Sequence, residues 1–230
     1  MIVAVQKPLE EVFEFTRPFR KVLLLGCGTC VTVCSAGGEK EVATLASALA
    51  LKSRSEGLGQ EFLQNTIERQ CDREFIEQVI GQVNSCDAVV SLACGAGVQL
   101  LAQAADKAVK ILPGLNTKFI AVTAEQGVWK EYCRGCGDCI LHITEGICPV
   151  TRCSKGLMNG PCGGYSKEGK CEADPQVECA WLLIFERARE RGRLSELRKL
   201  VQPRNWSQAA AGVPKAVVRE DLRLVQDAQA

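Results

Sequence analysis

The sequence predicts an α/β fold, in which a Rossmann-like or flavodoxin-like parallel sheet domain is followed by a cysteine-rich module and a C-terminal helical tail. Between residues 20 and 124, apolar strand-like runs alternate with helical stretches, as in parallel sheets with crossover helices. From Gln126 to Cys179 this periodicity gives way to glycine, proline and eight cysteines. After Cys179, apolar and charged residues recur at helical spacing. We therefore predict three segments, 1–125, 126–180 and 181–230.

The first segment contains the elements of an open sheet. We expect strands at Val22–Leu25, Phe62–Glu68 and Ala88–Ala93, and shorter ones at Lys110–Leu112 and Phe119–Thr123. Helices are expected over Lys40–Ser53, from an N-cap at Asp72 to Val83, and over Val98–Ala108. If the first three strands lie in the order 2-1-3, the loops after the second and third strands flank the loop after the first.

The second and third segments differ from the sheet domain in what can hold them together. Residues 126–180 cannot bury much apolar surface, so we expect this module to be organised by metal. The third segment is expected to begin with an amphipathic helix over Ala180–Val201. An extended stretch around Pro203–Trp206 and a short helix near the C-terminus follow. We assign this tail to partner docking.

Composition excludes several functions. The chain has 28 basic and 27 acidic residues and a net charge of +1, which gives no general attraction to nucleic acid or to anionic membranes. The first residues do not resemble a signal peptide, and the longest apolar run, Val22 to Cys34, is too short to span a bilayer. We expect a cytoplasmic protein with no membrane span and no nucleic-acid partner.

The chain contains 14 cysteines in 230 residues. Disulfides are disfavoured in a reducing compartment, and a chain of this size does not need them for stability. Buried structural thiols would be scattered, whereas these are clustered. The cysteines therefore indicate metal or redox chemistry.

One cluster of cysteines follows the predicted strands. Cys27, Cys30 and Cys34 come directly after the first strand, and glycines beside them allow tight turns. Cys71 follows the second strand and Cys94 the third, so all should meet at the carboxyl edge of the sheet. The sequence predicts a metal centre formed by the first three cysteines and either Cys94, which we prefer, or Cys71.

A second cluster begins at Cys133-x2-Cys136-x2-Cys139 and is followed by Cys148-Pro149. This spacing resembles the run that holds a [4Fe–4S] cluster in bacterial ferredoxins, although eight residues separate the third cysteine from Cys148. Completion of this centre by Cys148 or by Cys179 is open. The remaining thiols, from Cys153, Cys162, Cys171 and Cys179, suggest a further centre, and zinc in place of a cluster is an alternative there.

Other candidate residues are less informative. His142 is the only histidine, which excludes a multi-histidine metal site, and we expect it to pack beside a cluster. We interpret the carboxylates of Asp138, Glu145 and Glu172 as exposed loop charges. Cys86 is expected to be structural. No set of residues is typical of a catalytic or nucleotide-binding site.

Several motifs together resemble one family. Cys133-Arg-Gly-Cys-Gly-Asp-Cys139, Gly146-Ile-Cys-Pro-Val-Thr-Arg-Cys153, Leu157-Met-Asn-Gly-Pro-Cys-Gly-Gly164 and Gly169-Lys-Cys-Glu172 are similar to the cysteine-rich C-terminal domain associated with methylenetetrahydrofolate reductase. The upstream Cys27 to Cys34 run, Gly37-Gly-Glu-Lys-Glu-Val42, Arg69-Gln-Cys-Asp72 and Ala93-Cys-Gly-Ala-Gly-Val98 resemble the small iron–sulfur partner subunit of two-subunit methylenetetrahydrofolate reductases of acetogenic bacteria.

The resemblance implies an electron-transfer subunit of an oxidoreductase complex, not catalytic alone. It would carry two or three [4Fe–4S] clusters and pass electrons to the FMN or FAD of a barrel subunit in the Wood–Ljungdahl pathway. A ferredoxin or a further subunit would be the electron donor. The alternative is a zinc-stabilised structural or interaction subunit without a redox role.

Overall fold

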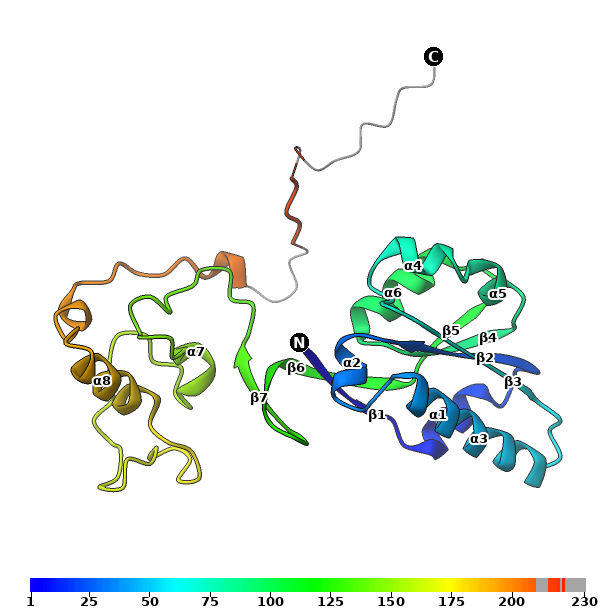
Figure 1. Cartoon of the computed structure of the whole chain (residues 1–230), viewed down its shortest axis with the longest axis horizontal. Coiled ribbons are helices and arrows are strands. Elements are labelled where there is room, and N and C mark those ends of the chain that lie inside the picture. Colours follow the sequence, from blue (N-terminus) through cyan, green and yellow to red (C-terminus); the bar gives the residue numbers. More distant parts are fainter. Residues whose placement is uncertain (210–214, 220, 222–230) are drawn as a thin grey trace, which may run out of the picture. The chain divides into compact units, whose positions relative to one another are not determined.

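The computed structural model describes residues 1–209, 215–219 and 221. The chain forms two compact units, Met1–Arg134 and Gly135–Ala230. The short helix expected near the C-terminus falls mostly outside the described residues. Each unit is described by itself below, and Figure 1 labels the elements.

A four-stranded parallel sheet forms the centre of the first unit (Figure 1). Its strands are β2 (Lys21–Cys27), β3 (Glu61–Ile67), β4 (Ala88–Leu92) and β5 (Lys110–Pro113), in the order β3-β2-β4-β5. The predicted order of the first three of these strands is thereby confirmed. Because β2 lies between β3 and β4, the loop after β2 has a strand end on each side.

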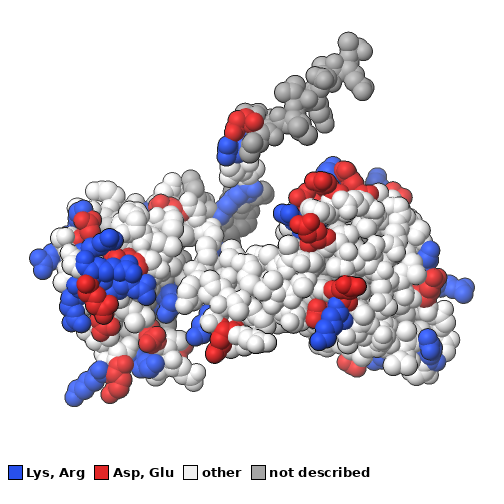
Figure 2. Space-filling model, in the orientation of Figure 1, with Lys and Arg blue, Asp and Glu red and all other residues white. Residues whose placement is uncertain are grey.

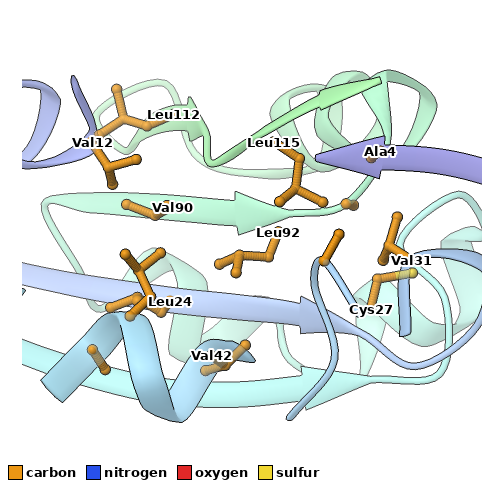
Figure 3. Packing of buried hydrophobic residues seen from close by; sticks show 14 of the residues in the cluster. Ala4, Val12, Leu24, Cys27, Val31, Val42, Val90, Leu92, Leu112 and Leu115 are labelled. Carbon is orange, nitrogen blue, oxygen red and sulfur yellow. The ribbon is translucent and has the colours of Figure 1, made fainter. Parts of the chain in front are cut away.

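Side chains of the sheet alternate between two apolar layers, as the pleat requires. Val22 and Leu24 of β2 face a cluster with α1 (Leu9–Thr16) and α3 (Glu39–Ser55). Figure 3 shows Leu24 and Val90 in this layer, with Val42 of α3 close by. Leu23 and Leu25 face α4 (Arg73–Glu77), α5 (Ile80–Asn84) and α6 (Gly95–Ala104). Helices thus cover both faces, the expected arrangement for a parallel sheet.

A second, antiparallel sheet completes the first unit. It consists of β1 (Ile2–Gln6), β6 (Leu115–Glu125) and β7 (Val128–Cys133), in the order β1-β6-β7. We did not predict β1, α1 or β7, and we expected no strand after Gln126. Strand β7 lacks a clear apolar alternation because half of its residues are exposed and none is buried. It is held by pairing with β6 across a turn at Gly127, whose φ is +81°.

The predicted helices are present with different ends. Asp72 is an N-cap, as predicted, and its carboxylate accepts a hydrogen bond from the backbone N–H of Glu74 at 3.3 Å, but the helix is divided into α4 and α5. In the second unit, α8 (Ala180–Glu190) ends well before Val201. Gly192 has a φ of +67°, the left-handed conformation that terminates helices.

The described part of the second unit has little regular structure. Besides α8, its described residues form α7 (Pro149–Arg152) and the 3₁₀ turns Glu196–Arg198 and Trp206–Ala209. Its buried apolar cluster is small, formed by Ile147, Trp181 and Ile184. A core of this size offsets little of the entropy of ordering so long a segment. Nowhere in the described part of the chain is there a helix with the length and apolar character needed to cross a bilayer.

We expect Gly37→Ala to destabilise the first unit. A Cβ atom at Gly37 would collide with the backbone carbonyl of Leu92, which cannot move without disturbing the end of β4. The expected loss is about 1–3 kcal/mol in the free energy of unfolding, measured by urea denaturation. Gly81→Ala is the control, because nothing lies within 4 Å of its Cβ position and alanine favours the helix. Equal stability of the two variants would contradict the packing described.

Candidate metal centres

Four cysteines lie at the carboxyl edge of the parallel sheet, and we call them the rim group: Cys27, Cys30, Cys71 and Cys94. Cys27 is the last residue of β2, and Cys30 begins the short helix α2 (Cys30–Val33). Cys94 is the N-cap of α6, directly after β4, and Cys71 lies in the loop after β3. The strand order thus brings thiols from three successive loops to one edge, as predicted.

The electrostatics of Cys71 show that the thiols of the rim group are neighbours. The pKa of Cys71 is raised, first because nearby atoms remove part of its hydration and then because charge on Cys94, Cys27 and Cys30 would repel its thiolate. Four thiolates this close cannot all be charged cheaply without a cation. Both Cys71 and Cys94 therefore lie near Cys27 and Cys30, and the choice of a fourth ligand between them stays open.

Backbone hydrogen bonds hold the loop after β2 against the end of β3. The N–H of Gly28 donates to the carbonyl of Ile67 at 2.8 Å, and the hydroxyl of Thr29 donates to the carbonyl of Glu68 at 2.9 Å. The hydroxyl of Thr32 donates to the carbonyl of Cys27 at 2.8 Å. These bonds fix the positions of Cys27 and Cys30 relative to the loop that carries Cys71.

The residue before Cys71 is a buried glutamine that ties three strand ends together. The side-chain amide of Gln70 donates to the carbonyls of Leu25 and Gly26 at 2.8 and 3.0 Å, and its oxygen accepts from the hydroxyl of Ser91 at 2.6 Å. Gln70 is fully buried. A Cβ at Gly97 would lie 2.8 Å from the Cβ of Gln70, so glycine there lets α6 start close to this amide. Sequence reasoning missed Gln70, because a single polar residue in a loop gives no signal of burial.

Cys34 and Cys86 are placed differently from the rim group. The thiol of Cys34 is buried and donates to the carbonyls of Ala4 and Val31 at 3.6 and 3.5 Å. Its charge is also not among the causes that raise the pKa of Cys71. Cys86 is buried against α5 and its thiol donates to the carbonyl of Gln82 at 3.4 Å. The predicted metal role of Cys34 has no support from these contacts, and Cys86 has the surroundings of a structural thiol.

In the second unit, four cysteines surround one small cavity, and we call them the loop group: Cys153, Cys162, Cys171 and Cys179. The cavity volume is about 20 Å³, and Leu157, Pro161 and Trp181 form its apolar wall. Cys153 is the C-cap of α7, and Cys179 is the N-cap of α8. The four thiols for which the sequence suggested a further centre thus lie around one common space.

Hydrogen bonds favour the charged form of one thiol in the loop group. The pKa of Cys171 is lowered, chiefly by the hydroxyl of Ser154, then by the backbone N–H groups of Ala173 and Asp174, with a smaller contribution from Lys155. The Lys155 ammonium also pairs with the carboxylate of Glu172. That carboxylate accepts a hydrogen bond from the thiol of Cys162 at 3.5 Å.

The cysteines that follow β7, from Cys136 to Cys148, lie on irregular backbone. Cys133 ends β7 in the first unit, whereas Cys136, Cys139 and Cys148 belong to the second. Within the second unit, the guanidinium of Arg204 donates to the sulfur of Cys136 at 3.0 Å and to the carbonyl of Asp138. Cys139 lines a cavity of about 1210 Å³. Sequence reasoning missed Arg204, since it lies 68 residues from Cys136.

Two further expectations concern residues near these cysteines. His142 is exposed and lines the same large cavity as Cys139. The expectation that Glu145 is an exposed loop charge is wrong, because Glu145 is only 5% exposed. Its carboxylate lies 3.0 Å from Arg191 and 3.6 Å from Arg193, and its carbonyl accepts from Arg187 at 3.1 Å. Glu145 thus anchors the end of α8, a structural role.

In the parts of the chain that the structure describes, no group of three or more His, Cys, Asp or Glu side chains is arranged to hold a metal ion. The thiols of the rim group and of the loop group are therefore neighbours that do not have coordination geometry. The assignment of cysteines to metal centres stays a prediction.

The surface over α2, β1 and β6 is poorly charged. Figure 2 shows few charged side chains over α2, β1 and β6 on the visible face of the first unit, whereas both signs are mixed elsewhere. Val5, Val33, Ile120 and Val122 are exposed on these elements. The edge that carries the rim group therefore adjoins exposed apolar side chains.

The fold and these thiol groups define a cysteine-rich α/β protein with two sets of neighbouring thiols. Residues 112–207 match a family model described as "Methylene-tetrahydrofolate reductase C terminal". The matched segment includes all eight cysteines from Cys133 to Cys179 and supports a relationship to methylenetetrahydrofolate reductases. No curated protein and no solved structure matches the chain.

The opposite pKa shifts of two cysteines predict their order of alkylation in the reduced, metal-free chain. A lowered pKa gives Cys171 its thiolate at lower pH, whereas a raised pKa delays the thiolate of Cys71 to higher pH. Pulsed iodoacetamide followed by peptide mass spectrometry should give a lower midpoint pH for Cys171, each curve normalised to its own plateau. In Cys94→Ser the midpoint for Cys71 should fall, because a repelling thiolate is gone. The reverse order of midpoints would refute these environments.

Proposed function

We propose that this chain is an iron–sulfur electron-transfer subunit that passes electrons to the flavin of a partner methylenetetrahydrofolate reductase subunit in the Wood–Ljungdahl pathway. The observation that carries the proposal is the rim group, four neighbouring thiols from three loops at the edge where open α/β sheets place their ligands. The family match over residues 112–207 supplies the enzyme that such a subunit would serve.

The donor set of the rim group suits a [4Fe–4S] cluster. Such clusters are held by four cysteine thiolates and exchange single electrons when bound. Cys27, Cys30, Cys71 and Cys94 would be the ligands. The helix start at Cys94 offers backbone N–H groups that favour negative charge on its sulfur. Gln70 and the hydroxyls of Thr29 and Thr32 would keep the ligand loops in place.

A second cluster is proposed for Cys133, Cys136, Cys139 and Cys148, on the basis of their spacing. The Arg204 guanidinium donates to the sulfur of Cys136, so a cation lies beside one of the proposed ligands. The large cavity beside Cys139 leaves room for a group of several atoms.

The division of labour between two subunits fits the described part of the chain. A barrel of the kind expected for the flavin subunit needs eight parallel strands and about 250 residues. The described residues form one four-stranded parallel sheet and one three-stranded antiparallel sheet. A site for folate or for hydride transfer is not evident among the described side chains, so reduction of methylenetetrahydrofolate is assigned to the partner.

Cys71→Ser and Cys94→Ser should each remove the rim cluster. We expect a loss of about four iron atoms per chain relative to wild type. Anaerobic reconstitution followed by iron and sulfide analysis and electron paramagnetic resonance would measure this. Cys34→Ala and Cys86→Ala are matched controls, because both thiols bond to backbone carbonyls in the core. If Cys34→Ala lost iron and Cys71→Ser kept it, the ligand set proposed for the rim would be refuted.

The isolated chain should not turn over methylenetetrahydrofolate, and activity should appear when the flavin subunit is added. With that subunit, Cys94→Ser should lower turnover with a reduced ferredoxin or viologen donor by at least about tenfold, because the path to the flavin is broken. Direct chemical reduction of the partner's flavin should be unaffected, which serves as the control. A colourless chain that contains only zinc and leaves activity unchanged would favour the structural alternative.

A further inference from the structure

We propose that the loop group, Cys153, Cys162, Cys171 and Cys179, binds a single zinc ion that organises the second unit, and not a third iron–sulfur cluster. This inference is independent of the electron-transfer proposal, because it concerns other cysteines and a metal without redox chemistry. Four thiolates are a common ligand set of structural zinc, with zinc–sulfur distances of about 2.3 Å.

The size of the space between the thiols favours one atom. The cavity that the loop group surrounds has a volume of about 20 Å³, little more than the room that one water molecule needs. A [4Fe–4S] core brings eight iron and sulfide atoms, which would push apart Trp181 and Leu157 in the cavity wall. Trp181 is buried and its indole N–H donates to the carbonyl of Leu157 at 2.9 Å, so this wall is held closed.

The surroundings of the sulfur atoms suit thiolates. Cys179 is the N-cap of α8, where the helix dipole favours negative charge. Arg152, Lys155 and Glu172 also line the cavity, and the Lys155 ammonium pairs with the Glu172 carboxylate. When four thiols release their protons to solvent and coordinate Zn²⁺, a net charge of −2 remains, which Arg152 and the start of α8 partly offset.

The positions of the four cysteines explain what the ion would do. Cys153 ends α7 and Cys179 begins α8, while Cys162 and Cys171 lie on the irregular backbone between these helices. That intervening backbone has only one isolated bridge, Lys170 to Glu178, among its described residues. The apolar cluster of this unit is formed by Ile147, Trp181 and Ile184. Coordination would therefore supply the cross-links that this small core does not, and metal binding would contribute directly to folding.

The test is metal analysis of the full chain, prepared anaerobically with both iron and zinc supplied. We expect about one zinc per chain, resistant to brief treatment with a chelator, in addition to the iron of the clusters. Zinc X-ray absorption should show a shell of sulfur alone. A shell with nitrogen or oxygen ligands would overturn the four-thiol site, as would about twelve iron atoms per chain without zinc.

Single substitutions test whether the zinc ion binds at the loop group. Cys171→Ser and Cys179→Ser should lose the zinc and keep the iron of the rim cluster, whereas Cys30→Ser should lose iron and keep zinc. Glu172→Gln should retain zinc, because its carboxylate contacts Cys162 without being a ligand in this proposal. Loss of zinc in Cys30→Ser but not in Cys171→Ser would overturn the inference. The rim cluster's absorption reports a folded first unit in Cys171→Ser, Cys179→Ser and Glu172→Gln, and circular dichroism reports folding of Cys30→Ser.

The two proposals fail separately. A chain with zinc on the loop group but no iron would sink the electron-transfer proposal and support this inference. A chain with three clusters and no zinc would do the opposite. If Cys171→Ser lowers expression, zinc X-ray absorption of the wild-type chain still decides the ligand set.

Discussion

The buried amide of Gln70 is the interaction on which the edge of the sheet depends. Its hydrogen bonds to the carbonyls of Leu25 and Gly26 and from the hydroxyl of Ser91 join the ends of β2 and β4 to the loop after β3. A buried amide that lost these partners would cost about 1–3 kcal/mol for each unmade bond. The loop that carries Cys71 is therefore fixed relative to Cys27 and Cys94 before any metal binds.

The second unit is constrained in another way. Its buried carboxylate, Glu145, is surrounded by arginines at the end of α8, and its small apolar cluster lies beside the loop group. Ion pairs and metal coordination would thus stabilise the second unit, as apolar burial stabilises the first. This contrast explains why glycines with positive φ are frequent here, since tight turns around a centre need conformations that other residues avoid.

The parallel sheet could be predicted from the sequence, whereas the rest of the first unit could not. Val22–Leu25 and Ala88–Ala93 are buried on both sides, and such strands leave an unbroken apolar signal. Strand β7 is half exposed and is fixed by its partner strand, so no local pattern marks it. For the candidate site, the positions of Cys27, Cys71 and Cys94 after the predicted strands indicated the carboxyl edge of the parallel sheet, where they lie. Spacing does not show that the Cys34 thiol is buried against the carbonyls of Ala4 and Val31, because that depends on how the backbone turns after α2.

The four rim cysteines are unequally exposed, and this would decide the side from which a redox partner approaches a centre bound there. Cys27 is buried, Cys30 and Cys94 are partly covered, and Cys71 is exposed. Electron tunnelling weakens steeply with distance, so a redox partner would approach the centre from the Cys71 corner, where the least protein intervenes. The same corner would be the first reached by molecular oxygen. Exposure of Cys71 would therefore speed electron exchange with a partner and, at the same time, make the centre more sensitive to oxygen.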